Sequence, residues 1–152
     1  MTLQSELLCT IAITVDPKFQ EVGSATWGQR RIVQVTGGTF EGPRLKGRVL
    51  PGGGDWILTR PDGVTQLDVR ITLETDDGAL IYMTYRGLRH GPPEVLARLA
   101  KGERVEPSEY YFRTVPCFET ASEKYAWLNR ALFVSTGDRL PAGPIYTVYE
   151  IL

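Results

Sequence analysis

A carboxylic acid followed directly by an indole, at Asp55-Trp56, is the first pair of residues in this chain with a clear chemical use. An apolar neighbour desolvates a carboxyl group and raises its pKa toward the range of a general acid or base. A structural hydrogen-bonded pair is the alternative. We therefore take Asp55 as a candidate catalytic residue and Trp56 as a candidate ligand contact.

Charged and phenolic side chains two residues apart form a second candidate set. Asp68 and Arg70 share one face of a predicted strand, and Tyr111, Arg113 and Glu119 share one face of another. If both faces turn inward, they line a cavity suited to an anionic or phenolic ligand. Alternation does not say which face is inside, so an arginine–aspartate pair on the outer surface is the alternative.

Two aromatic residues and an amide complete the candidates, at Tyr125, Trp127 and Asn129. The aromatic rings suit the stacking walls of a ligand site, and the amide suits a group that orients the ligand. Core packing explains the two aromatic residues equally well.

Several kinds of site are excluded or disfavoured by residue type. His90 is the single histidine, which rules out a histidine-based triad and a multi-histidine metal site. Cys9 and Cys117 lack metal-ligand spacing and fit buried free thiols, and Asp76-Asp77 fits a turn. We therefore expect no metal and no cofactor.

Composition indicates one domain over residues 1–152, with 17 basic and 18 acidic residues and a net charge of -1. The longest basic cluster is Arg30-Arg31, so we expect no nucleic-acid partner. No apolar run is long enough for a membrane span, and the N-terminal residues include Glu6 and Asp16 and lack a basic signal region. We expect a cytoplasmic protein with a small-molecule partner; a homodimer or higher homo-oligomer is left open.

Alternation with a period of two residues dominates the chain and predicts an all-β fold. Expected strands cover residues 7–15, 30–36, 45–50, 56–60, 67–74, 80–88, 110–119, 131–136 and 145–152. In the first strand, Leu7 and Cys9 should share one face. Turns are expected at Gly37-Gly38, at residues 61–63 and at residues 76–78, and residues 122–129 form a turn or one helical turn. One short helix is expected over residues 92–101, with Gly102 just beyond its end.

Glycine and proline are concentrated between Gly37 and Gly54, which is typical of tight corners and bulges in a sheet. The glycines at 52–54 lead into a strand, and no Gly-Lys-Ser follows, so this segment is not a phosphate-binding loop. We predict a single closed or nearly closed, mainly antiparallel β-barrel of about nine strands.

The same glycines, together with other short motifs, resemble a known family. In order, these are Gly37-Gly38, Gly42-Pro43, Gly47, Leu50-Pro51-Gly52-Gly53, Asp55-Trp56, Asp62-Gly63, Asp68 with Arg70, Asp76-Asp77-Gly78, Gly87 and Trp127-Leu128-Asn129. Their order and spacing along nearly the whole chain are similar to domain-of-unknown-function family 3237, the bacterial and fungal UPF0311 proteins. The resemblance implies a barrel like those of lipocalins and allene oxide cyclase. It implies no activity and no catalytic residues.

Two functions compete on these residues. In the first, a barrel enzyme without metal or organic cofactor acts on a small carbonyl or phenolic compound, as an isomerase, cyclase or lyase. Asp55 moves a proton, and Arg70 or Arg113 stabilises an enolate-like oxygen. In the second, a non-catalytic carrier barrel binds a small anionic, partly apolar ligand through the same arginines. A third hypothesis, self-assembly alone, predicts a filled barrel without a pocket.

Overall fold

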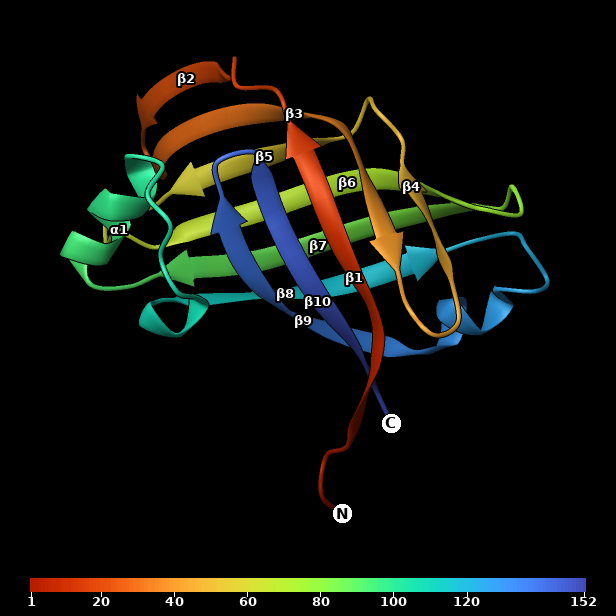
Figure 1. Ribbon diagram of the computed structural model, residues 1–152. Coiled ribbons are helices and arrows are strands. Elements are labelled where there is room, and N and C mark those ends of the chain that lie inside the picture. The colour runs from red at the N-terminus through yellow and green to blue at the C-terminus, as the bar shows by residue number, and fades with distance from the viewer.

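Ten strands of the computed structural model, which describes residues 1–152, form one antiparallel sheet (Figure 1). The strands are β1 (Ser5–Val15), β2 (Gln20–Ala25), β3 (Gly28–Glu41), β4 (Lys46–Val49), β5 (Gly54–Thr59), β6 (Thr65–Thr75), β7 (Leu80–His90), β8 (Tyr111–Glu119), β9 (Leu132–Leu140) and β10 (Gly143–Ile151). The helix α1 (Pro93–Ala100) follows β7, and two short 3₁₀ segments, η1 (Pro107–Glu109) and η2 (Ala126–Arg130), flank β8. No helix has the length and apolar composition needed to cross a membrane.

The sheet closes into a barrel because β1 pairs with both β10 and β3. The ring runs β1-β10-β9-β8-β7-β6-β4-β3 and returns to β1, which makes eight strands. β5 lies in the same gap as β4, between β3 and β6, and β2 pairs with β3 outside the ring. The prediction of a closed antiparallel barrel with one short helix is confirmed, with eight strands in the ring and two outside it.

Inward side chains fill one half of the barrel. On β6, Leu67, Val69, Ile71 and Leu73 are all buried, as their alternation predicts. In the half that contains Ile71 and Leu73, apolar side chains from the surrounding strands pack together, and Leu128 of η2 is buried against them. Figure 1 shows α1 at one end of the barrel and the η2 segment, in blue, at the opposite end. The η2 end is therefore the packed end.

The expected turn at Gly37-Gly38 is wrong, because β3 continues through both residues to Glu41. Up to Gln34, β3 pairs with β5. From Val35 it pairs with β1, with a register shift opposite Thr14 and Val15, and from Thr39 it also pairs with β4. Gly38 has a φ of +140°, and a Cβ there would lie 2.1 Å from the carbonyl oxygen of Ala12. The two glycines therefore bend a continuous strand where it changes partners.

Two further differences arise at the start of the chain. Leu7 does not share a face with Cys9, because a bulge between them shifts the register against β10 and leaves Leu7 40% exposed. β2 was not expected, since its side chains are almost all exposed and lack apolar alternation. The helix confirms its prediction: α1 has proline in its first turn, and Gly102, with a φ of +78°, follows its end.

Candidate functional site

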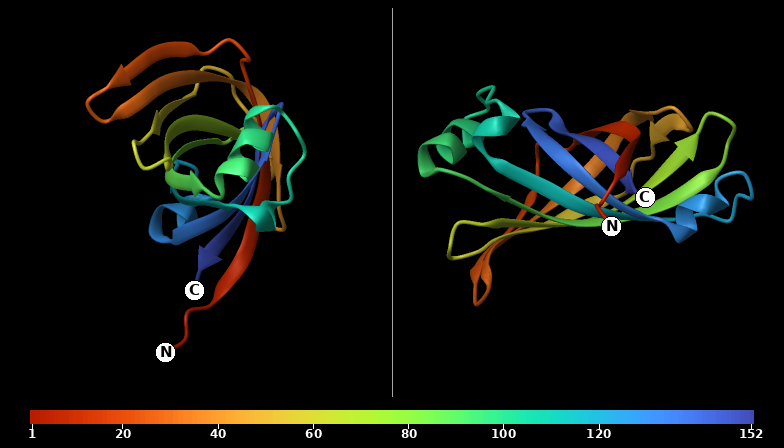
Figure 2. Two further views of the ribbon diagram at one scale, coloured as in Figure 1. Left: turned by 90° about the vertical axis from the view of Figure 1, so that its left-hand side faces the viewer. Right: turned by 90° about the horizontal axis from the view of Figure 1, so that it is seen from below.

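A cavity of about 700 Å³ occupies the half of the barrel that the apolar core leaves unfilled. Its walls come from β5 and from every strand of the ring except β4, and Leu96 and Leu99 of α1 and Pro141 of the β9–β10 turn lie at its mouth. Figure 2 shows α1 lying across this end of the barrel. A cavity of this size contradicts the filled barrel that self-assembly alone predicts.

Asp55 lies inside this cavity because of the register of β5. It is paired with Val33 of β3 on one side and with Val69 of β6 on the other, and both valines face the interior. The carboxylate oxygen Oδ1 accepts a hydrogen bond of 3.1 Å from the backbone N–H of Asp68. Burial raises the pKa of Asp55 to about 6, although this hydrogen bond and the charge of Arg89 act to lower it.

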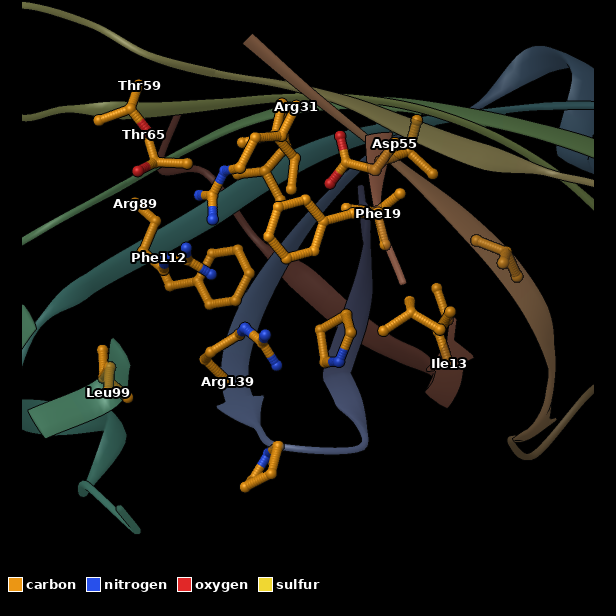
Figure 3. A pocket seen from close by; sticks show the side chains of 18 of the residues that line it. Ile13, Phe19, Arg31, Asp55, Thr59, Thr65, Arg89, Leu99, Phe112 and Arg139 are labelled. Carbon is orange, nitrogen blue, oxygen red and sulfur yellow. The ribbon is translucent and has the colours of Figure 1, made fainter. Parts of the chain in front are cut away.

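Three arginines point into the same space, as Figure 3 shows. Arg31 comes from β3, Arg89 from β7 and Arg139 from β9, each on the inward face of its strand. Burial lowers the pKa of Arg89 and of Arg139, and the positive charge of Arg139 lowers that of Arg89 further. Guanidinium groups carry a positive charge in proteins at neutral pH. The cavity therefore combines one carboxylate with three guanidinium groups.

Aromatic rings separate these charges from the apolar core. The ring of Tyr146 meets Tyr85 edge-on at 5.0 Å between centroids and Phe112 at 5.4 Å. The Arg89 guanidinium carbon lies 5.5 Å from the Phe112 ring centroid. Burial raises the pKa of both tyrosines, so both phenols stay protonated, and the buried Tyr146 hydroxyl has no hydrogen-bond partner. The site thus offers neutral hydroxyl donors beside the charged groups.

Among the predicted catalytic residues, only Asp55 lies in the cavity. The inward position of Leu67 and Val69 forces Asp68 and Arg70 outward, where their side chains lie 3.8 Å apart. Arg113 faces outward on β8 for the same reason, since the residues on either side of it, Phe112 and Thr114, are buried. Asp68 and Arg70 therefore form the arginine–aspartate pair on the outer surface, which was the alternative to an inward position.

The outward-facing candidates come together in a different place, on the outer wall of the barrel. Trp56, Asp68, Tyr111 and Arg113 line a shallow groove of about 500 Å³, and the Arg70 guanidinium lies 5.2 Å from the Trp56 ring. The cavity and this groove lie on opposite faces of the same strands. A ligand-binding role for these residues stays a prediction, and it would concern the groove.

The four remaining candidates lie away from the cavity: Glu119, Tyr125, Trp127 and Asn129. Glu119 is exposed on the outer face of β8. Asn129 accepts a hydrogen bond from the backbone N–H of Thr120 at 2.8 Å and donates one to its carbonyl at 2.9 Å. The Tyr125 hydroxyl donates a hydrogen bond of 3.0 Å to the Asp77 carboxylate. The guanidinium carbon of Arg44 lies 4.0 Å from the centroid of the Trp127 ring. In the structure the last three residues hold together the packed end of the barrel.

The three arginines of the cavity were not predicted as site residues from the sequence, although the alternation pattern indicated an inward position for two of them. Arg31 alternates with Val33 and Val35, and Arg89 continues the alternation of the buried Tyr85 beyond the predicted end of that strand. Arg139 lies past the predicted end of its strand, where no apolar alternation continues. Continuing the alternation of inward-facing residues to the end of each strand would have identified Arg31 and Arg89 as inward-facing.

The arrangement supports proton transfer beside a stabilised anion. A carboxyl group with a pKa near neutrality both accepts and donates a proton, and guanidinium groups stabilise negative charge that develops on a nearby oxygen. No three His, Cys, Asp or Glu side chains gather closely enough to hold a metal ion.

Fold and cavity together define a class: an antiparallel barrel closed by eight strands, with an internal cavity that is both charged and aromatic. The family model described as "Protein of unknown function (DUF3237)" matches residues 3–151, and the chain belongs to this family. A UPF0311 protein of Clostridium acetobutylicum is 39% identical over 146 residues, which are 96% of this chain and 92% of the relative. The resemblance expected from the glycine-rich motifs is confirmed.

Solved structures agree with this assignment. A crystal structure of a beta-barrel like protein from Acinetobacter baumannii is 43% identical, with a TM-score of 0.88 over 100% of this chain and 98% of that one. A crystal structure of an enzyme from Penicillium herquei has a TM-score of 0.76 at 22% identity and covers 100% of this chain and 96% of that one. The second likeness concerns the fold alone.

Proposed function

We propose that the cavity is the active site of an acid–base enzyme of the isomerase, cyclase or lyase type that acts on a small carbonyl or phenolic compound. The observation that carries this proposal is the position of Asp55, a carboxyl group with a pKa of about 6 inside a cavity whose lining includes three guanidinium groups. A general base works best when its pKa is near the working pH, because it is then deprotonated yet still basic.

One carboxylate oxygen of Asp55 accepts a hydrogen bond from the backbone, and the other is free to exchange a proton with a substrate. Oδ1 accepts the hydrogen bond from the backbone of Asp68, which fixes the carboxyl group relative to β6. Oδ2 is left to take a proton from the carbon next to a substrate carbonyl, and the electron pair of the broken C–H bond becomes an enolate. Return of the proton at another carbon isomerises the substrate, loss of a β-leaving group makes the reaction a lyase reaction, and internal attack closes a ring.

The arginines in the cavity take the role that we expected of Arg70 and Arg113. Arg31 and Arg89 both act electrostatically on the Asp55 carboxylate, so both lie near enough to stabilise an enolate formed beside it. The neutral phenols of Tyr85 and Tyr146 supply hydrogen-bond donors without adding charge. This set provides a base, an anion-stabilising group and proton donors in one closed space.

The relationship to known enzymes supplies only an analogy. The Penicillium herquei structure is described as an enzyme and has this barrel, so the fold is compatible with catalysis. A carrier barrel is the second candidate, favoured by the lining: 15 of the 26 residues are hydrophobic, and three arginines are available for an anionic ligand. A carrier would bind the same compounds without moving a proton.

Deuterium exchange separates the two functions. Hydroxylated aryl ketones, which are both phenolic and enolisable, are incubated with the protein in D₂O and analysed by mass spectrometry for deuterium uptake or product. We expect turnover with at least one compound, and a loss of about 10²- to 10⁴-fold in Asp55→Asn, the size of a general-base contribution. Asp76→Asn, in the exposed turn after β6, is the matched control and should keep full activity. Binding without exchange or product in the wild type supports the carrier.

A further inference from the structure

The three arginines inside the barrel share the lack of an ion pair. Most arginines on the surface form ion pairs with acids, as Arg44, Arg48 and Arg60 do, and only Arg30, Arg113 and Arg130 on the surface have none. None of the ion pairs in the structure includes Arg31, Arg89 or Arg139. Three partly buried cations therefore face a shared space without a salt-bridged counter-charge, an arrangement that favours binding of an anion from outside.

Hydrogen-bond donors in the cavity also lack partners. The Nε atom of Arg31 is buried and has no hydrogen-bond partner, and the Tyr146 hydroxyl beside the arginines has none either. Arg139 gives one guanidinium N–H to the backbone carbonyl of Leu140, which leaves its other donors free. Buried donors of this kind are normally satisfied, so their common direction into one cavity indicates an acceptor that binds there.

We propose that the cavity binds its substrate as an aromatic monocarboxylate, with the carboxylate between Arg89 and Arg139 and the ring against the apolar wall near Phe112. This inference rests on the proposed function, because it names the substrate class of the same site. Arg89 and Arg139 are the pair chosen because both point into the cavity next to Phe112 (Figure 3), with the Arg89 guanidinium carbon 5.5 Å from the Phe112 ring, and because their like charges act on each other. An oxyanion between them would replace their repulsion with two charge-assisted hydrogen-bonded contacts.

The charge of the cavity sets the charge of the ligand. Its lining holds three guanidinium groups against two carboxylates, Asp55 inside and Asp16 near the mouth, where Asp16 accepts a hydrogen bond from the backbone of Lys18. This leaves an excess of one positive charge, which a single carboxylate neutralises and a phosphate dianion would overcompensate. The rings of Phe112, Tyr85 and Tyr146 supply a wall suited to a flat aromatic body.

Binding measurements with simple probes test this inference without knowledge of the true substrate. Benzoate and naphthoate are compared with their neutral amides and with inorganic phosphate by isothermal titration calorimetry at constant ionic strength. We expect at least one carboxylate to bind at a single site and at least tenfold more tightly than its amide, and phosphate not to bind. Equal affinity for carboxylate and amide, or no binding of any carboxylate, would overturn the inference, and neither result depends on a variant.

Variants then locate the anion. Arg89→Gln and Arg139→Gln should each weaken carboxylate binding about 10- to 100-fold, which is the effect of losing a hydrogen bond to a charged group. Arg113→Gln, on the outer face of β8, is the matched control and should bind as the wild type does. If one of the two variants does not fold by circular dichroism, the other decides. Unchanged affinity in the folded variant would refute this placement.

The outcome is separable from that of the enzyme proposal. Asp55→Asn should keep or strengthen carboxylate binding, since it removes a negative charge from the cavity, whereas it should slow exchange by about 10²- to 10⁴-fold. Tight carboxylate binding without exchange or product leaves the anion site standing and refutes the enzyme. Exchange or product formation combined with equal binding of carboxylate and amide refutes the anion site and leaves the enzyme standing.

Discussion

Replacing Asp55 with asparagine removes a charge that the barrel interior solvates poorly, so the variant should be more stable than the wild type at neutral pH. The folded-state pKa of about 6 lies above the ordinary value of 3.8. Between these values the folded chain binds a proton that the unfolded chain has released, so wild-type stability falls as the pH rises through this window. Asparagine has no such titration, and its side-chain oxygen can still accept the hydrogen bond from Asp68.

The size of the effect follows from the two pKa values. A shift of one pKa unit corresponds to about 1.4 kcal/mol, so the rise from 3.8 to about 6 corresponds to roughly 3 kcal/mol. This contribution is present in full below the ordinary pKa of Asp55 and is lost above its folded-state pKa. The difference in unfolding free energy between Asp55→Asn and the wild type should therefore grow by about 2.4 kcal/mol between pH 4 and pH 7, which is most of the full effect.

Urea unfolding of both proteins at half-unit steps from pH 4 to pH 8, followed by tryptophan fluorescence and circular dichroism, measures this difference. Titrations of all other groups cancel to first order in the comparison, provided the two probes agree and the urea dependence is equal for both proteins. Asp76→Asn, in the exposed turn after β6, is measured in parallel as the control for loss of a surface carboxyl group. Parallel curves for Asp55→Asn and the wild type would refute the raised pKa and, with it, the argument for Asp55 as a base.

Three further substitutions test the fold around the site. Gly38→Ala should destabilise the barrel by at least about 2 kcal/mol in urea, because its φ is +140° and the new Cβ would meet the carbonyl of Ala12; an unchanged midpoint would contradict the role of glycine at this bend. Asn129→Ala should cost about 1–3 kcal/mol through two lost hydrogen bonds at the packed end, with no change in naphthoate affinity, whereas a large loss of affinity would place this residue in the site after all. Gly137→Ala should push the ring of Phe112, which the new Cβ would approach to 2.6 Å, toward the cavity and weaken naphthoate binding; equal or tighter binding would show that the ring moves elsewhere.

The sequence predicted the barrel because alternation is a local property. Along β6 the alternating apolar residues from Leu67 to Leu73 mark the inner face, and the residue types that follow the strand are enough to predict a turn. Local patterns fail where the backbone departs from regular pairing. The bulge after Leu7 and the bend at Gly37-Gly38 depend on contacts with strands distant in the sequence. β2 is held only by its pairing with β3 and carries no buried face to reveal it.

The site was predicted less completely, because it depends on pairing between distant strands. Asp55 was found from its neighbours in sequence, but its inward direction follows from register with Val33 and Val69. Arg70 was chosen by residue type, and the same alternation that buries Val69 places it outside. Arg139 joins Asp55 in one cavity only because the ring closes, which no local pattern contains.

A carboxyl group that exchanges protons near neutral pH inside the cavity is the central requirement of the proposed chemistry, and a carbon-13 NMR titration of the Asp55 side-chain carboxyl measures that property directly. The signal is assigned by its absence in Asp55→Asn. We predict a titration midpoint for Asp55 near pH 6, as burial in the cavity requires. A midpoint near pH 4 would contradict the account, because Asp55 would then be an ordinary solvated carboxylate without the basicity that the proposed chemistry needs.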